Sequence, residues 1–289
     1  MRQLSDIFFS HLKSGFLSGI TESVKNDPDL NLEIRNNYIN VYYKGHSLLK
    51  LTETPSLRYR TEIHKKFLEG LNLPLELTEG NVTQFLFTIP LLKQNIVKYG
   101  KRSLEVEYEQ MIIRANNFEL RNNTEYFIVD RQYTDPAGRF DLTGIFWEMS
   151  HRQKKQEVPV CLMEVKFALN PDIEEVHNQL ARYYKAIEPR AAEIAEEMQT
   201  VFRQKIALEL YRQPADRIAA LKTLVFSKDI KAFQFILILV DYNHNSTRLD
   251  LDRLSSLPFA NQVKVFFSGF GMWQENVKPL SRILSKNRS

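Results

Sequence analysis

The apolar run from Val158 to Phe167 constrains the fold of this chain more than any other segment. An apolar run bounded by turn residues is typical of a central strand that is covered on both faces. Only Glu164 and Lys166 bring charge into it, and because side chains two apart on a strand share a face, both point the same way. Val165 then points into the opposite layer. Charges at the end of a central strand need partners, so the sequence predicts a site here.

The segments around this run predict an α/β fold with a mixed central sheet. Short connections between three successive strands favour their antiparallel pairing. The predicted elements are, in chain order, a helix from 104 to about 116, strands over 126–131, 140–147 and 158–167, a helix over 173–187 that Asp172 caps, and strands over 233–241 and 263–267. The order is therefore helix, three strands, helix, strand, with one more strand after it.

The first hundred residues have a different pattern, and we interpret residues 1–100 as a smaller α/β module before a larger domain over 101–289. Helical spacing at the start is followed by strand-like alternation at 32–35 and 38–43, a turn at 44–46 and a hairpin strand over 47–51. Residues 82–96 are apolar at helical intervals, and Pro90 starts, bends or ends an element there. Within the larger domain, segment 189–223 predicts a helical insertion that Pro214 divides.

Composition limits the classes of function. The 289 residues are 43% hydrophobic, enough for a large core, and the net charge of only +4 requires any nucleic-acid surface to be local. Cys161 is the single cysteine, which excludes an intrachain disulfide and fits a reducing compartment. The N-terminus lacks the apolar core of a signal peptide, and the apolar run 233–240 is far below the ~20 residues that span a bilayer. We therefore expect a cytoplasmic protein without a membrane partner.

The residues that carry chemistry follow in order along the chain. A Gly-Arg-Phe-Asp stretch over 138–141 opens the second strand, and strand pairing can bring Asp141 beside Glu164. The two carboxylates and the Val165 carbonyl are oxygen ligands suited to Mg²⁺ or Mn²⁺. The metal would polarise a phosphate and lower the pKa of a bound water. Lys166 would orient that water and stabilise the developing charge.

Two residues of the following helix extend this set. If the apolar stripe of the helix faces the sheet, the 100° step puts Gln179 and Tyr183 on one shared edge, from which both reach toward the metal. An amide donates and accepts hydrogen bonds, and a tyrosine offers a ring and a hydroxyl, so the pair can position a phosphate or stack a base. With Arg139, they form the expected substrate-binding residues.

Each piece also has an ordinary structural explanation. A Glu-Val-Lys sequence by itself is more often the charged face of a half-exposed hairpin, and a Gln and a Tyr four residues apart commonly border an amphipathic helix. The six histidines are scattered without zinc spacing, and there is no Gly-Lys-Ser/Thr phosphate loop. No other cluster in the sequence offers chemistry comparable to that of the two carboxylates and the lysine.

The segment from about Leu104 to Phe267 resembles the PD-(D/E)xK nuclease superfamily, and within it the RecB-type branch. The pattern of that branch, Gly-x-x-Asp, Glu-x-Lys and Gln-x-x-x-Tyr, corresponds here to Gly138 and Asp141, Glu164 and Lys166, and Gln179 and Tyr183. The resemblance implies a restriction-endonuclease-like αβββαβ core and metal-dependent cleavage of DNA. It implies Asp141 and Glu164 as metal ligands and Lys166 as the catalytic cation. It also implies a glutamate of the first core helix near the metal, for which Glu105, Glu107 and Glu109 all remain candidates.

These observations predict a Mg²⁺- or Mn²⁺-dependent nuclease that acts on DNA, in repair or in defence against foreign DNA. The alternative is a catalytically silent nucleic-acid-binding or assembly protein on a nuclease fold. A second copy of the chain or an accessory protein would use the 1–100 module or the helices of 189–223 as its interface. DNA or RNA, single or double strands, and cleavage at ends or within the chain all stay open.

Overall fold

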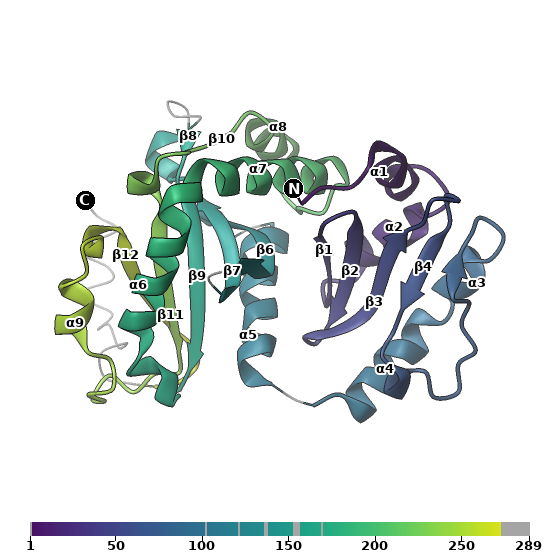
Figure 1. Ribbon diagram of the computed structural model, residues 1–289. Helices are drawn as coiled ribbons and strands as arrows, with labels where there is room; N and C mark the ends of the chain where they lie inside the picture. The colour runs from purple at the N-terminus through teal and green to yellow at the C-terminus, as the bar shows by residue number, and fades with distance from the viewer. Residues whose placement is uncertain are drawn as a thin grey trace, which may run out of the picture.

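The computed structural model describes residues 2–101, 103–120, 122–135, 138–152, 157–168 and 170–272. They form a mixed α/β structure on two five-stranded sheets, which lie side by side with helices around them (Figure 1). One sheet, within the first hundred residues, is antiparallel, and the other is mixed and contains the expected central strand. The predicted α/β class with a mixed central sheet is confirmed.

The mixed sheet has the strand order β12-β11-β9-β7-β6. Strands β6 (Tyr126–Asp135), β7 (Gly138–Phe146) and β9 (Val160–Phe167) form the predicted antiparallel series. Strands β11 (Gln234–Val240) and β12 (Val263–Ser268) continue the sheet parallel to β9. Every residue of β9 before its last is buried, so this strand is central as predicted.

Helices cover both faces of the mixed sheet. Helix α5 (Leu104–Ile113), continued by a π-helical turn over Arg114–Phe118, packs over the face that contains Met163 and Val165. Helix α6 (Val176–Ile187) packs on the opposite face, in the same apolar cluster as Leu162. Because of the two-residue period of β9, Glu164 and Lys166 lie on the α6 face.

Two boundary predictions are wrong. Asp172 does not cap the helix: Asn170 caps a 3-10 turn over Pro171–Ile173 by accepting a hydrogen bond from the Asp172 N–H, and α6 begins after Glu175. The expected strand over 158–167 is divided at Pro159, which has no N–H to donate. Its first piece, β8 (Glu157–Val158), instead pairs in parallel with β10 (Val225–Phe226).

The expected helical insertion consists of α7 (Ala191–Ala207) and α8 (Ala215–Leu221), with Pro214 between them as predicted. Helix α7 runs along the top of Figure 1, from the mixed sheet toward the N-terminal helices. Its apolar stripe, which includes Ile194, Met198 and Val201, is buried in the main core. This stripe is therefore covered within the chain. A short helix, α9 (Leu251–Ser255), precedes β12.

The N-terminal sheet follows two helices, α1 (Asp6–Lys13) and α2 (Ser18–Asn26). Its strands are β1 (Leu30–Ile34), β2 (Tyr38–Tyr43), β3 (His46–Glu53), β4 (Tyr59–Glu62) and β5 (Glu76–Leu77). The hairpin between β2 and β3 is confirmed, whereas β4 and β5 are short, polar and not predicted. Helices α3 (Val82–Leu86) and α4 (Ile89–Tyr99) follow, and Pro90 lies in the first turn of α4.

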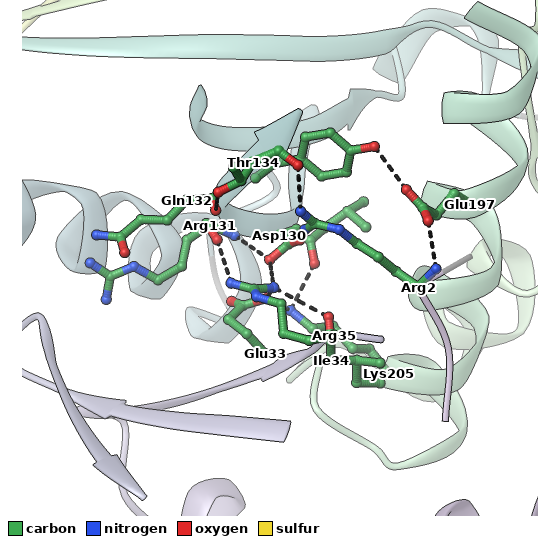
Figure 2. Close-up of polar contacts among 12 residues, drawn as sticks. Arg2, Glu33, Ile34, Arg35, Asp130, Arg131, Gln132, Thr134, Glu197 and Lys205 are labelled. Carbon is green, nitrogen blue, oxygen red and sulfur yellow. Dashed lines mark hydrogen bonds and ion pairs between the residues drawn. The ribbon is translucent and has the colours of Figure 1, made fainter. Parts of the chain in front are cut away.

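Buried ion pairs join the N-terminal sheet to the mixed sheet (Figure 2). Glu33 of β1 pairs with Lys205 of α7 at 2.7 Å. Arg35 pairs with Asp130 of β6 and donates a hydrogen bond to the Arg131 carbonyl at 2.6 Å. All of these side chains are buried. The first hundred residues are thus docked on the strand that precedes β7. No helix among the described residues is long and apolar enough to cross a membrane.

Candidate active site

Strand β7 places Asp141 beside β9 at the point where the ladder between the two strands ends. The last paired residues are Leu142 and Met163. One residue further, the Asp141 side chain replaces the backbone as the acceptor, because its Oδ2 accepts a hydrogen bond from the Val165 N–H at 2.8 Å. The half-buried carboxylate is therefore held against the backbone of the strand that carries Glu164 and Lys166.

Strand β7 also changes face at Asp141. Leu142 packs in the cluster under α5, whereas Phe140, two residues earlier, packs on the α6 side with its ring centroid 4.2 Å from that of Tyr183. In β6, Gln132 lies between the partners of Phe140 and Leu142 and has a φ of 51°. This local twist breaks the two-residue alternation of both strands. It explains why the residues on either side of Asp141 belong to opposite layers.

Glu164 and Lys166 form a buried pair on the α6 face of β9. Lys166 Nζ lies 2.8 Å from Glu164 Oε1, and the two residues are only 7% and 4% exposed. Gln179 Nε2 of α6 donates a second hydrogen bond to the same oxygen at 2.6 Å. The other oxygen, Glu164 Oε2, is buried and has no hydrogen-bond partner in the described part of the chain. A buried carboxylate oxygen without a donor is costly, and a bound cation would satisfy it.

Gly138 and Tyr183 meet beside this site. The Tyr183 hydroxyl accepts a hydrogen bond from Gln179 at 2.8 Å and donates one to the Arg139 carbonyl at 2.9 Å. Gly138 has a φ of 144°, and a Cβ there would lie 2.8 Å from Tyr183 Cε1. Glycine is therefore required both by the backbone and by the ring that covers it. These contacts tie α6 to the start of β7.

The expected substrate-binding residues lie close together, but they differ in how exposed their side chains are to solvent. Tyr183 is buried and Gln179 is engaged with Glu164, so their hydrogen bonds hold the site in place. The Arg139 side chain is exposed, and its charge acts to lower the pKa of Asp141. A role in substrate binding stays a prediction for all three.

The three glutamates of α5 have different surroundings. Glu109 forms a buried ion pair with Arg131 at 2.8 Å, and Glu105 accepts a hydrogen bond from Asn170 at 2.7 Å. Both act electrostatically on Asp141, as expected for residues four apart on one helical face. Glu107 instead lines a cavity of about 310 Å³ toward the N-terminal module. The structure thus narrows the candidates near the site to Glu105 and Glu109.

The negative charges of the two buried carboxylates are only partly offset by their surroundings. Burial, together with the charge of Asp141, raises the pKa of Glu164 to about 7. Burial also raises the pKa of Asp141, although the Val165 N–H and Lys166 oppose that rise. For Lys166, burial alone would lower the pKa, but the charges of Glu164, Asp141 and Glu105 outweigh it and the pKa is raised. Two adjacent carboxylates that gain protons in this way form a site that favours a cation.

The donor atoms fit magnesium better than a metal whose ligands must all come from the protein. No group of three or more His, Cys, Asp or Glu residues within the described ranges is placed to hold a metal ion. Asp141 and Glu164 offer two carboxylates, and the Val165 carbonyl is the third oxygen expected from the sequence. Mg²⁺ is usually held by one or two carboxylates, several waters and the phosphate of the substrate. The unsatisfied Glu164 Oε2 is the atom that such an ion would bind.

Comparison with known proteins gave no match. No protein-family model, curated protein or solved structure matches the chain.

Two residues near the site were not found from the sequence. Asn170, three residues after β9, donates a hydrogen bond to Glu105. Arg131 pairs with Glu109, and its Cζ lies over the Tyr42 ring, 4.8 Å from the ring centroid. An asparagine three residues after a charged strand end was the only available signal for the first. A buried arginine in a strand gives no signal, because its partner lies on a helix whose placement is a tertiary property.

Proposed function

We propose that the protein is a Mg²⁺-dependent nuclease that hydrolyses phosphodiester bonds, with DNA as the substrate. The observation that carries the proposal is the unsatisfied, buried Glu164 Oε2 beside Asp141, with Lys166 Nζ 2.8 Å from the other oxygen of the same carboxylate. An anionic site of this kind next to a lysine is suited to a divalent cation and a phosphate. The proposal includes a restriction-endonuclease-like core formed by α5, β6, β7, β9, α6 and β11, whose order supports it.

Each side chain has a defined part in this proposal. Asp141 and Glu164 would hold the ion, which when bound supplies the charge that polarises the phosphate and acidifies a water. Lys166 would orient the attacking water and stabilise the negative charge that develops on the phosphate. Gln179 donates to Glu164 Oε1 and so leaves Oε2 for the ion. In the reaction, the water oxygen forms a bond to phosphorus, the bond to the leaving oxygen breaks, and that oxygen takes a proton.

The experiment is a cleavage assay on circular and linear duplex DNA, single-stranded DNA and RNA, with Mg²⁺, Mn²⁺ or EDTA. We expect metal-dependent cutting that Asp141→Ala and Lys166→Ala abolish while the circular dichroism spectrum is retained. Lys228→Ala, at an exposed lysine that pairs with Glu196, is the matched control and should cut like the wild type. Cutting at the wild-type level by either site variant would contradict the assignment.

A titration with Mn²⁺ separates this proposal from the silent alternative. Heat released on binding to the wild type, and lost in Asp141→Ala, is expected for a nuclease with this site. Binding of nucleic acid without metal binding or cleavage would favour a catalytically silent protein on the same fold.

A further inference from the structure

We propose that a cluster of basic residues at the end of the N-terminal module binds the phosphate backbone of DNA beside the candidate active site. The basic cluster consists of His46, His64, Lys65, Lys66 and Lys101. This inference rests on the proposed nuclease function and names the surface that holds its substrate. It concerns residues outside the carboxylate and lysine site.

Three segments that are distant in the sequence bring the basic cluster together. Residues 64–66 lie at a 3-10 turn between β4 and β5, His46 begins β3, and Lys101 lies just after α4. The ring centroids of His46 and Phe67 are 5.6 Å apart, and Lys66 Nζ lies 4.9 Å from the Phe67 centroid. His46 Nε2 donates a hydrogen bond to the Lys101 carbonyl at 3.1 Å. The basic residues are thus gathered around the ring of Phe67.

Buried contacts hold this turn in place before any ligand binds. Phe67 is buried, and its carbonyl accepts a hydrogen bond from Asn95 Nδ2 of α4 at 2.9 Å. The same amide donates to the Glu69 carbonyl at 2.8 Å, and Asn95 is itself buried. The turn is therefore fixed on α4, so little backbone entropy is lost when the lysines bind a ligand.

The three lysines of the basic cluster have no counter-charge in the part of the chain that the structure describes. Lys65, Lys66 and Lys101 are exposed, and none of them forms an ion pair with a described residue. Glu69, the nearby carboxylate after the turn, pairs with Lys98 instead, at 3.4 Å. Unpaired cations gathered in one place create a local positive field. Each strand of DNA presents one negative charge per ~3.4 Å of helix axis, and lysines that replace its counterions bind it without sequence preference.

The basic cluster lies next to the helix that leads to the candidate active site. The turn between β2 and β3 packs on the first turn of α5, because a Cβ at Gly45 would collide with the Val106 side chain. Glu105, beside Val106, acts electrostatically on Asp141. Lys101 precedes Glu105 by four residues, which is at most about 14 Å of extended chain. A DNA strand bound by the basic cluster is therefore close enough to enter the candidate site.

The test measures the binding of fluorescently labelled DNA duplexes of two unrelated sequences in EDTA, where metal-dependent cleavage cannot occur. The cluster variant combines Lys65→Gln, Lys66→Gln and Lys101→Gln. The slope of log K against log salt concentration should become shallower by about 0.9 for each lysine, equally for both sequences. Between about 50 and 200 mM salt, the wild type should therefore lose about 40-fold more affinity than the cluster variant. Arginine at the three positions should restore the slope, because it keeps the charge.

The matched control removes three positive charges elsewhere, in the combined variant Lys13→Gln, Lys222→Gln and Lys231→Gln. These lysines are exposed and lie at the end of α1, directly after α8, and in the turn before β11. Helices α1 and α8 are at the top of Figure 1, whereas α5 starts near the bottom. The control should keep the affinity and the salt slope of the wild type. With Mg²⁺, the cluster variant should raise KM for DNA more than it lowers kcat, because it loses binding made equally before and during the reaction.

The outcomes distinguish this inference from the proposed function. Binding that depends on the basic cluster, without metal-dependent cleavage, would support the inference and contradict the nuclease proposal. Cleavage by the wild type, with equal DNA affinity and salt slope in the cluster and control variants, would do the reverse. An equal loss of affinity in both variants would overturn the inference, because net charge alone would then decide binding. No DNA binding by the wild type would overturn it as well.

Discussion

Replacing Lys205 with methionine tests the buried charges that join the two sheets. Lys205 Nζ lies 2.7 Å from Glu33 Oε2 and donates another hydrogen bond to the Val129 carbonyl at 2.7 Å. Methionine fills a similar volume without charge, so the substitution removes the ion pair and keeps most of the packing. Glu33 would then keep a hydrogen bond from Asn31 and the guanidinium of Arg35 at 3.7 Å.

The expected loss of stability is large because one buried charge loses its main partner. Breaking a buried ion pair by removing one side costs about 3–5 kcal/mol. The loss should also depend on pH. Burial raises the pKa of Glu33 to about 7, and the charge of Lys205 opposes that rise. In the folded state Glu33 thus keeps a proton that it releases when unfolded, so its contribution to stability falls as the pH rises from about 4.5 through about 7.

Without Lys205 the pKa of Glu33 rises further, and the destabilisation is therefore greater at pH 8 than at pH 5. Urea unfolding followed by circular dichroism at both pH values measures it. Glu33→Gln combined with Lys205→Met should recover much of the loss at pH 8.

The matched control is Lys228→Met. Lys228 pairs with Glu196 of α7 at 2.5 Å, but the two side chains are 56% and 52% exposed. An exposed pair contributes about 0–1 kcal/mol. Lys205 would not act as the counter-charge of Glu33 if Lys205→Met costs no more than this control, or if its cost is equal at pH 5 and pH 8. The same holds if the double variant is less stable than the single one.

Two further predictions concern the candidate site. Gly138→Ala should lower both kcat for DNA cleavage and the melting temperature, because the added Cβ would collide with the Tyr183 ring. Gly70→Ala is the control: Gly70 also has a positive φ but open space around it, so this variant measures the effect of backbone strain without a collision. A smaller loss in Gly138→Ala than in Gly70→Ala would contradict this. Glu164→Gln should raise the melting temperature at pH 8 in EDTA, because the raised pKa of Glu164 makes its charged form unfavourable in the folded protein at that pH. The same variant should no longer be stabilised by Mg²⁺. Equal Mg²⁺ stabilisation of variant and wild type would argue against Glu164 as a ligand.

The sequence by itself determined the elements whose patterns are local and strong. The apolar run of β9 fixed a central strand, and the two-residue period separated Glu164 and Lys166 from Val165. The 3.6-residue period and Pro214 gave α7 and α8. In these cases the side chains that decide the structure lie within one or two turns of each other, so the pattern can be read without knowing any partner.

Tertiary structure decided the features that depend on distant partners. The reversal of face at Asp141 depends on Gln132 of the neighbouring strand, and the requirement for glycine at 138 depends on the ring of Tyr183. Glu33 and Lys205 are 172 residues apart, and neither shows in its own segment that it is buried. A buried charge is stable only where the fold supplies its counter-charge, and that supply is a property of the packed chain.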